Sequence, residues 1–173
     1  SPTSTVSDST FSTAALTVLA TTDIHGHVFD WDYFADAAFP PSDKGRSSAP
    51  LGVSRVATIA KQVRAEQGAA SVVMLDNGDT IQGTPLTYLS AKQPEKLGHD
   101  EVMARAFNLV GYDAANIGNH EFNYGIAELF RYHNDLKAPL LCANVIDVKT
   151  GKPLTQGSLM LTKNVAGHEV KVG

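Results

Sequence analysis

Three short polar motifs, each placed directly after an apolar run, constrain the fold of this chain more than any other feature. They are DIH at 23–25 after LTVLATT, GD at 78–79 after SVVMLDN, and GNHE at 118–121 after YDAANI. Apolar runs of this length are typical of buried strands. Because an open α/β sheet gathers ligand-binding side chains at the carboxyl ends of its strands, the sequence predicts one site built from three strand ends.

Strand-like and helix-like segments alternate along the rest of the chain. Helical spacing of apolar residues begins at Val53, Val102 and Ile126, and further strands are predicted at 113–117 and 139–145. The resulting order, β-α-β-α-β-α-β, predicts an α/β fold in which helices cover a parallel sheet.

The two ends of the chain differ from its middle. Residues 1–15 are polar, rich in Ser and Thr and without periodicity, so they are expected to form a flexible lead-in. Residues 16–173 are expected to form one folded unit, in which 39–50 is a loop by its Pro, Ser and Gly content. Near the end, 158–164 with 169–172 is typical of the start of a β-hairpin.

Composition narrows the possible partners. Hydrophobic residues make up 43% and charged residues 18% of the chain, as in an ordinary globular protein. A net charge of −4 without a long basic run argues against a nucleic-acid polymer or an anionic membrane surface as partner. The sequence offers no apolar stretch long enough for a membrane span. The single cysteine, Cys142, excludes an intrachain disulfide and a Cys-rich zinc cluster, and is expected to be buried.

The motifs carry side chains that suit a divalent metal. Asp23 and His25 are two residues apart, so in an extended backbone both can reach one ion. Asp79 follows Gly78, which permits a close backbone approach, and its two carboxylate oxygens make it the candidate bridge between two cations. Asn119 can bind through its amide oxygen. Each motif alone also fits a polar strand end or a turn, so the prediction of a paired metal site depends on their joint occurrence.

His120 is the candidate catalytic residue. It neighbours Asn119, so the two side chains diverge, one toward the metals and the other toward the phosphate or leaving group of a substrate. Glu121 either supports these ligands or begins the next turn. Weaker candidates for supporting or substrate contacts are His27, Gln82 and Asn144. Two aromatic residues, Trp31 and Tyr33, either pack on the core or line the entrance to the site.

These motifs resemble those of a known family. Asp-x-His, Gly-Asp-x-x-x-Gly and Gly-Asn-His-Glu resemble the opening motifs of the calcineurin-like metallophosphoesterases. The longer segments ATTDIHGH (20–27), DNGDTIQGTPL (76–86) and GNHEFNYG (118–125) are similar to the 5'-nucleotidase branch. Together with FDWDYF (29–34) and NVIDVKTGKPL (144–154), they look most like the bacterial 2',3'-cyclic-nucleotide 2'-phosphodiesterase/3'-nucleotidases.

The resemblance implies a layered α/β/β/α sandwich, with this chain as the N-terminal portion of the catalytic domain and the C-terminal substrate domain absent. It implies hydrolysis of nucleotide phosphoesters, 2',3'-cyclic nucleotides and 3'-nucleotides above all, by a hydroxide activated between two divalent metal ions (Mn, Zn, Fe or Co). Residue by residue, Asp23, His25 and Asp79 hold the first metal. Asp79 and Asn119 contribute to the second, and His120 is the catalytic histidine.

Two departures from the family pattern matter. Asn123 stands where many 5'-nucleotidase relatives have an Asp that pairs with the catalytic histidine, and Asn cannot supply the negative charge that stabilises an imidazolium. Asn123 is therefore a catalytic candidate beside His120 and a mark of the cyclic-phosphodiesterase relatives. The family's further metal-binding histidines and its aromatic base-binding domain are expected downstream of this chain.

Two alternatives to this function stay open, a 5'-nucleotidase or nucleotide-sugar hydrolase and an inactive, truncated fragment that folds without turnover. The expected partner is a small nucleotide. The resemblance implies a secreted, periplasmic or cell-wall location.

Overall fold

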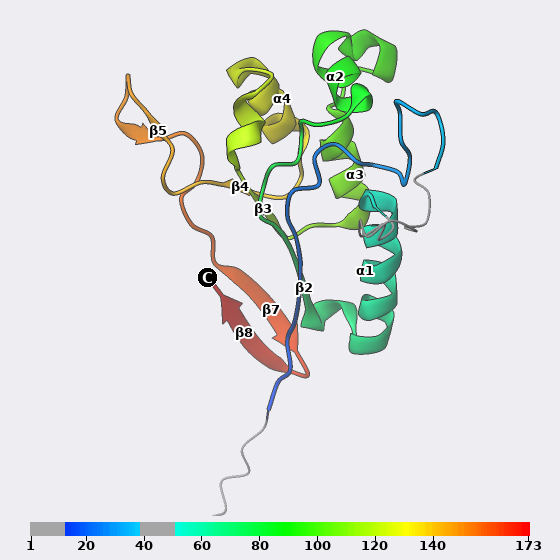
Figure 1. The fold of residues 1–173 in the computed structure, drawn as a ribbon. Coiled ribbons are helices and arrows are strands. Elements are labelled where there is room, and N and C mark those ends of the chain that lie inside the picture. Colours follow the sequence, from blue (N-terminus) through cyan, green and yellow to red (C-terminus); the bar gives the residue numbers. More distant parts are fainter. Residues whose placement is uncertain (1–12, 39–50) are drawn as a thin grey trace, which may run out of the picture.

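The computed structural model describes residues 13–38 and 51–173. Most of the expected lead-in and the expected loop at 39–50 lie outside the described residues. Four strands form one parallel sheet in the order β1-β2-β3-β4. They are β1 (Thr17–Thr21), β2 (Val72–Asp76), β3 (Ala114–Asn116) and β4 (Leu140–Leu141). Their carboxyl ends share the upper edge of the sheet in Figure 1, and the predicted α/β class with a parallel sheet is confirmed.

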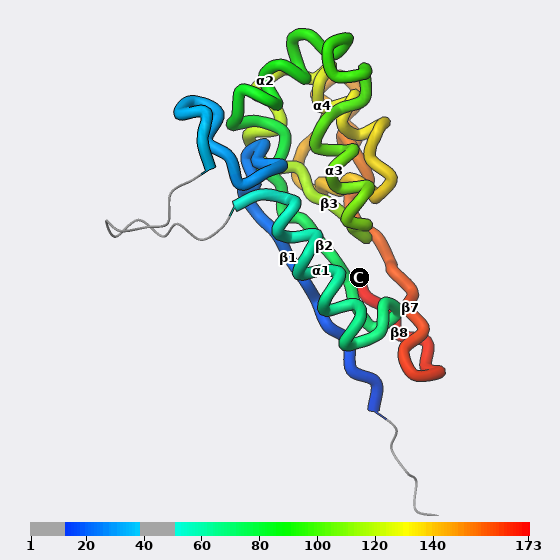
Figure 2. The backbone as a smooth tube through the Cα atoms, turned by 90° about the vertical axis from the view of Figure 1, so that its right-hand side faces the viewer, coloured from blue at the N-terminus to red at the C-terminus, as the bar shows by residue number. Residues whose placement is uncertain are grey.

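Helices form the crossovers that parallel pairing requires. They are α1 (Val53–Gln67), α2 (Pro85–Lys92), α3 (Val102–Val110) and α4 (Ile126–Asp135), with the 3-10 turns η1 (Ala69–Ser71), η2 (Pro94–Leu97) and η3 (Asn119–Phe122). Helices α1 and α3 pack against each other along one face of the sheet (Figures 1 and 2). The three helices expected from apolar spacing are confirmed as α1, α3 and α4.

Helix α2 corrects the predicted order, because two helices separate β2 from β3 where one is expected. Thr84 caps α2, with its Oγ1 accepting a hydrogen bond from the Thr87 N–H at 3.3 Å, and Pro85 occupies the first helical position. The helix has eight residues, which is too short for a clear apolar period. The sequence signal for this helix is its capping pair, Thr84 followed by Pro85.

The segment after β3 also differs in part from the prediction. The strand expected at 139–145 shrinks to the two residues of β4, since its partner β3 ends at Asn116, opposite Leu141. The next N–H, of Cys142, donates to the Gln156 carbonyl at 2.9 Å. Cys142 itself is buried, as expected. A small hairpin, β5 (Ile146–Asp147) with β6 (Lys152–Pro153), is not predicted by the sequence. The expected C-terminal hairpin is confirmed as β7 (Leu161–Val165) and β8 (His168–Val172).

The core lies between the sheet and its helices. Phe107 on α3 and Tyr132 on α4 are fully buried, and the Phe107 ring stacks on Tyr112 with centroids 4.0 Å apart. The β7–β8 hairpin is fastened to the amino-terminal end of the sheet, where Lys163 Nζ lies 2.6 Å from Asp113 Oδ1. The hairpin lies in the lower part of the molecule in Figure 1, at the other end of the sheet from α2 and α4.

Candidate metal centre

The loops that follow β1 and β2 continue the parallel pairing beyond the sheet. The Asp23 N–H donates to the Gly78 carbonyl at 3.0 Å, and the His25 N–H donates to the Asp79 carbonyl at 2.9 Å. The same ladder continues to Gly26, whose N–H donates to the Thr80 carbonyl at 2.8 Å. This ladder fixes the first two polar motifs side by side at the carboxyl edge.

Three residues of these loops have a left-handed backbone although none is glycine. The φ angles are 54° at Asp23, 49° at His25 and 58° at Asp79. Such conformations cost of order 1–3 kcal/mol each and persist only where the surrounding structure imposes them. Their concentration at one rim, where the loop ladder holds them, is typical of a functional site.

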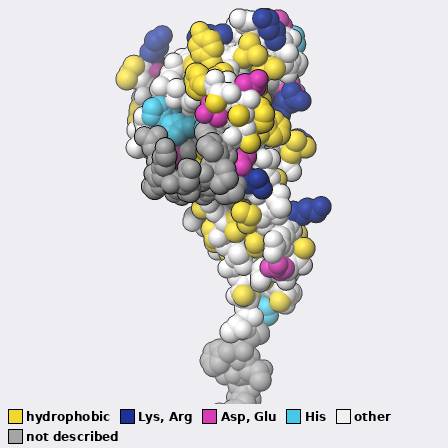
Figure 3. Space-filling view, turned by 45° about the vertical axis from the view of Figure 1, so that its right-hand side comes forward, with side chains coloured by type: hydrophobic (Ala, Val, Ile, Leu, Met, Phe, Trp, Pro, Cys, Tyr) yellow, Lys and Arg dark blue, Asp and Glu magenta, His cyan; other side chains and the backbone are white. Residues whose placement is uncertain are grey.

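The third motif joins the first two. Single ligand atoms of His25, Asp79 and His120 all lie within 4.8 Å of one another, an arrangement that could hold a metal ion. The rings of His25 and His120 meet edge to face with centroids 4.9 Å apart. We call this group the triad. Figure 3 shows histidine at the surface in the upper part of the molecule, next to hydrophobic and acidic side chains.

Asp23 and Asn119 stand beside the triad and are not members of it. The Asp23 Oδ1 lies 3.7 Å from His25 Nε2, and the Asp23 side chain is 58% exposed. Asn119 begins η3 directly before His120 and is exposed. Two of the four predicted metal ligands thus lie within the triad, and the other two lie next to it on the same rim.

His25 is oriented by the backbone of Gln82. Its Nδ1 lies 2.9 Å from the Gln82 carbonyl, which can only accept, so Nδ1 carries the proton and Nε2 has a lone pair for a cation. The sequence makes Gln82 a candidate for orienting a metal ligand. The structure gives the orienting contact to its main chain, which any residue type supplies.

Glu121 holds the Asp79 loop in place and is fully buried. Its Oε2 accepts from the N–H groups of Asp79 at 2.9 Å and Gly118 at 2.6 Å. Its Oε1 accepts from the N–H groups of Thr80 at 2.5 Å and Ile81 at 3.2 Å. Of the two interpretations that the sequence leaves open for Glu121, the geometry matches support of the ligand loop.

Glycine is required where this loop meets the loop after β3. A Cβ on Gly78 would overlap the backbone of Gly118, and a Cβ on Gly118 would overlap the Asp79 carboxylate. That carboxylate is tied to the same loop, since Asp79 Oδ1 accepts from the His120 N–H at 2.8 Å. The Gly-Asp and Gly-Asn-His-Glu motifs are therefore in direct contact, and their glycines leave the room that this contact needs.

Asn123 lies against His120, as the sequence suggests. The Asn123 Nδ2 and His120 Nδ1 are 3.2 Å apart, and because an amide nitrogen can only donate, His120 Nδ1 is the acceptor. The neutral ring then carries its proton on Nε2.

Asp76 is a residue of this site that sequence reasoning missed. The residue is 5% exposed, and burial raises the pKa of its carboxyl group to about 6. Hydrogen bonds from Thr21 Oγ1 at 2.7 Å and Thr80 Oγ1 at 2.8 Å act in the opposite direction, because they stabilise the carboxylate. It also accepts from the Gly78 N–H at 3.0 Å. The signal was present in SVVMLD, because a carboxylate at the end of a buried apolar run needs partners.

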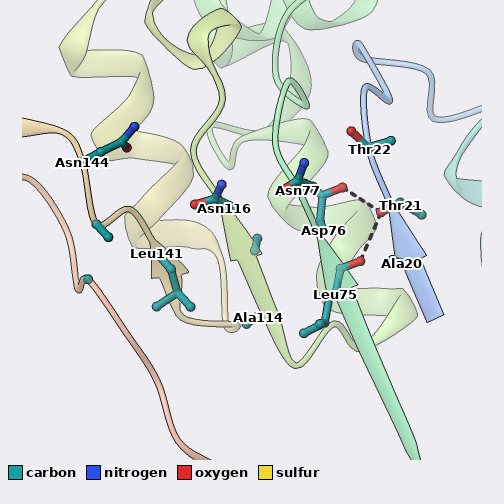
Figure 4. Close-up of a pocket in the computed structure, with 13 residues that line it drawn as sticks. Ala20, Thr21, Thr22, Leu75, Asp76, Asn77, Ala114, Asn116, Leu141 and Asn144 are labelled. Carbon is teal, nitrogen blue, oxygen red and sulfur yellow. Dashed lines mark hydrogen bonds between the residues drawn. The ribbon is translucent and has the colours of Figure 1, made fainter. Parts of the chain in front are cut away.

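The remaining candidates, Asn144 and His27, lie in different surroundings. A cavity of about 740 Å³ opens on the sheet face, with Asn77, Asn116 and Asn144 near the ends of three successive strands on its wall (Figure 4). Asn144 Oδ1 accepts from the Cys142 thiol at 3.2 Å. His27 lies on the ligand loop, and burial together with the nearby His25 lowers its pKa, against an opposing contribution from Asp32.

Comparison with known proteins gives relatives in sequence and in fold. No protein-family model matches the chain. A 2',3'-cyclic-nucleotide 2'-phosphodiesterase/3'-nucleotidase of Yersinia enterocolitica is 39% identical over 174 residues, which cover 98% of this chain and 25% of that protein. A protein of the same name from Haemophilus influenzae is 34% identical over 91% of this chain and 23% of its own length. The crystal structure of the calcineurin-like phosphoesterase YfkN from Bacillus subtilis is 31% identical, with a TM-score of 0.76, over 92% of this chain and 46% of that chain.

By sequence and by fold, the chain belongs to the calcineurin-like phosphoesterases. Within that family it is similar to the N-terminal part of the 2',3'-cyclic-nucleotide 2'-phosphodiesterase/3'-nucleotidases. The chain spans about a quarter of the length of these curated relatives. Among the helices of the described residues, none is both long and apolar enough to cross a membrane.

Proposed function

We propose that this chain forms the metal-binding part of an enzyme that hydrolyses nucleotide phosphoesters, with 2',3'-cyclic nucleotides and 3'-nucleotides as substrates. The observation that carries the proposal is the convergence of His25, Asp79 and His120 at the ends of three strands. The names of the relatives at 34–39% identity support the substrate class. A secreted or periplasmic location stays a prediction of the family resemblance.

The side chains at the rim fit a pair of divalent cations. In the proposed arrangement Asp23, His25 and Asp79 hold one ion, and Asp79 with Asn119 contributes to the other. The fit is supported by the buried carboxylate and the backbone carbonyl that fix Asp79 and His25. Carboxylate, imidazole and amide donors without a thiolate suit Mn, Zn, Fe or Co. Such ions supply Lewis acidity toward phosphate oxygens and lower the pKa of water.

His120 is the residue proposed to act on the substrate directly. Because Nδ1 accepts a hydrogen bond from Asn123 in the neutral ring, Nε2–H can donate a hydrogen bond to an oxygen of the phosphate and stabilise its charge. Protonation of the departing ribose oxygen would require the imidazolium form, in which Nδ1 also carries a proton. Glu121 and Asp76 act through the loop that they hold, and we assign them positioning roles.

The test compares hydrolysis of 2',3'-cyclic AMP, 3'-AMP and 5'-AMP by the chain, first stripped of metal with a chelator and then supplied with Mn²⁺ or Zn²⁺. We expect hydrolysis of the first two substrates to require added metal and to be lost in Asp79→Asn. The exposed Asp100→Asn serves as the matched control. Preference for 5'-AMP would support a 5'-nucleotidase, and metal binding without turnover of any substrate would support the fragment hypothesis.

A further inference from the structure

The first turn of α2 lies directly against the loop that carries His25. We call residues 23–27 the His25 loop. The contact is made by Thr84, the residue that caps the helix, whose Oγ1 donates a hydrogen bond to the Gly26 carbonyl at 3.0 Å. Thr84 is only 5% exposed, and a buried hydroxyl needs a partner. The cap of a helix is therefore bonded to the loop that presents a triad residue.

Three consecutive residues hold the His25 loop, each by a different means. Gln82 uses its carbonyl, which accepts from His25 Nδ1 at 2.9 Å. Gly83 uses the absence of a side chain, since a Cβ at this position would overlap the His25 carbonyl. Thr84 uses its hydroxyl. Of these three contacts, only that of Thr84 depends on a side-chain functional group, so a substitution that keeps the shape of the side chain can remove it.

The His25 loop needs such contacts because its backbone is strained. His25 has a φ of 49° and Gly26 a φ of 76°, and a left-handed conformation at a residue other than glycine persists only where the surroundings impose it. A Cβ on Gly26 would overlap the side chains of Thr84 and Thr87. The position of the Thr84 side chain and the path of the His25 loop are therefore linked.

The Thr84 hydroxyl has a second role, in the cap of α2. It accepts from the Thr87 N–H at 3.3 Å, and in return the Thr84 N–H donates to Thr87 Oγ1 at 3.3 Å. The simpler interpretation of Thr84 is that it serves the helix alone. Thr87 separates the two roles, because it shares the cap while no hydrogen bond within the described residues joins it to the His25 loop.

We propose that Thr84 is a positioning residue for the metal centre, whose hydroxyl holds the Gly26 carbonyl and so keeps the His25 imidazole where Nε2 can bind a cation. This inference rests on the proposed function, because it concerns the metal ion that the triad is proposed to hold. Groups that directly orient a metal ligand contribute about 10–100-fold to metal affinity. Thr84 acts one contact further away, so we expect its hydroxyl to contribute about 3- to 10-fold.

The experiment compares the parent chain with three variants. Thr84→Val keeps the shape of the side chain and removes the hydroxyl, whereas Thr84→Ser keeps the hydroxyl. Thr87→Val is the matched control, because it removes the other hydroxyl of the same cap. Urea unfolding should show a loss of stability in both valine variants, since both weaken the cap.

Two further measurements report on His25. In NMR spectra of the metal-free chain, the His25 imidazole signals should shift in Thr84→Val, with faster exchange of the Nδ1 proton, and should stay unchanged in Thr84→Ser and Thr87→Val. In titration calorimetry with Mn²⁺, the Kd of folded Thr84→Val should rise about 3- to 10-fold, and the other two variants should match the parent.

A fourth variant covers the case in which Thr84→Val does not fold. Thr84→Asn keeps a side-chain acceptor for the cap, and Asn caps helices at least as well as Thr. Its larger amide must displace Gly26, since even a Cβ on Gly26 would overlap Thr84 Oγ1. We therefore expect Thr84→Asn to fold, to shift the His25 signals and to bind Mn²⁺ more weakly than the parent.

The proposal is overturned if the His25 signals or the Mn²⁺ affinity of Thr84→Val match the parent. It is also overturned if Thr84→Ser or Thr87→Val changes them as much as Thr84→Val does. Because the NMR signals are read without metal, they test Thr84 even in a chain that binds no Mn²⁺. A parent chain that binds no Mn²⁺, with shifted His25 signals in Thr84→Val alone, would sink the proposed metal site and leave the contact between Thr84 and the His25 loop standing.

Discussion

Replacement of Glu121 by glutamine should loosen the whole ligand rim. Each of its two carboxylate oxygens accepts two backbone N–H groups, from Asp79 and Gly118 on one side and from Thr80 and Ile81 on the other. A glutamine has one oxygen and one NH₂ group. Whichever way the amide turns, its NH₂ faces two N–H donors that then have no acceptor.

The structure sets the size of this effect. A buried donor left without a partner costs about 1–3 kcal/mol, and Glu121→Gln leaves two of them in a fully buried place. We therefore expect a loss of about 2–6 kcal/mol in the free energy of unfolding. The Asp79 carboxylate should lose its fixed position at the same time, so the affinity for a divalent ion should fall.

Urea unfolding followed by circular dichroism measures the first effect, and titration calorimetry with Mn²⁺ measures the second. The matched control is Glu128→Gln, which removes a buried carboxylate paired with Arg131 at 2.6 Å on α4. That variant should lose stability but keep the affinity of its folded form for Mn²⁺. A Glu121→Gln chain with the stability and Mn²⁺ affinity of the parent would refute the reasoning.

Three further changes test other parts of the site and core. Asn123→Asp in the active protein should shift the pH–rate profile to higher pH, because a carboxylate stabilises the protonated form of the neighbouring imidazole, and an unchanged profile would argue against their contact. Burial raises the pKa of Glu101 from 4.5 to about 8, so the folded chain keeps a proton that the unfolded chain releases, and stability should fall as pH rises through that window. Glu101→Gln should remove this loss of stability, which is at most about 5 kcal/mol. Urea unfolding from pH 4.5 to 8 measures it, and an equal loss in the variant would show that Glu101 is not its source. Gly118→Ala, whose Cβ would overlap the Asp79 carboxylate, should abolish Mn²⁺ binding in calorimetry, whereas Gly157→Ala, with ordinary clearance, should not.

The rim itself could be predicted because it depends on short-range patterns. A buried strand ends where its apolar run ends, and parallel strands bring those ends to one edge. The motifs at 23–25, 78–79 and 118–121 therefore meet as the sequence indicates. The same reasoning places α1, α3 and α4, whose apolar residues recur over two or more turns.

Other features depend on contacts that no local pattern shows. Helix α2 is short, and its sequence signal is a cap. Strand β4 ends early because its partner β3 ends at Asn116, and Cys142 then pairs with the distant Gln156. Three of the four backbone N–H groups that donate to Glu121 belong to residues about forty positions earlier in the chain. Gln82 orients His25 through a carbonyl that every residue has, so its side chain carries no signal.

The most direct test of the metal centre is Mn²⁺-induced broadening of the histidine imidazole signals in NMR spectra of the chain. Broadening by a bound paramagnetic ion falls steeply with distance, and His168 lies on β8, at the other end of the sheet from the triad. We expect substoichiometric Mn²⁺ to broaden the signals of His25 and His120 first and to spare those of His99 and His168. Equal broadening of all four, or none at His25 and His120, would contradict this expectation.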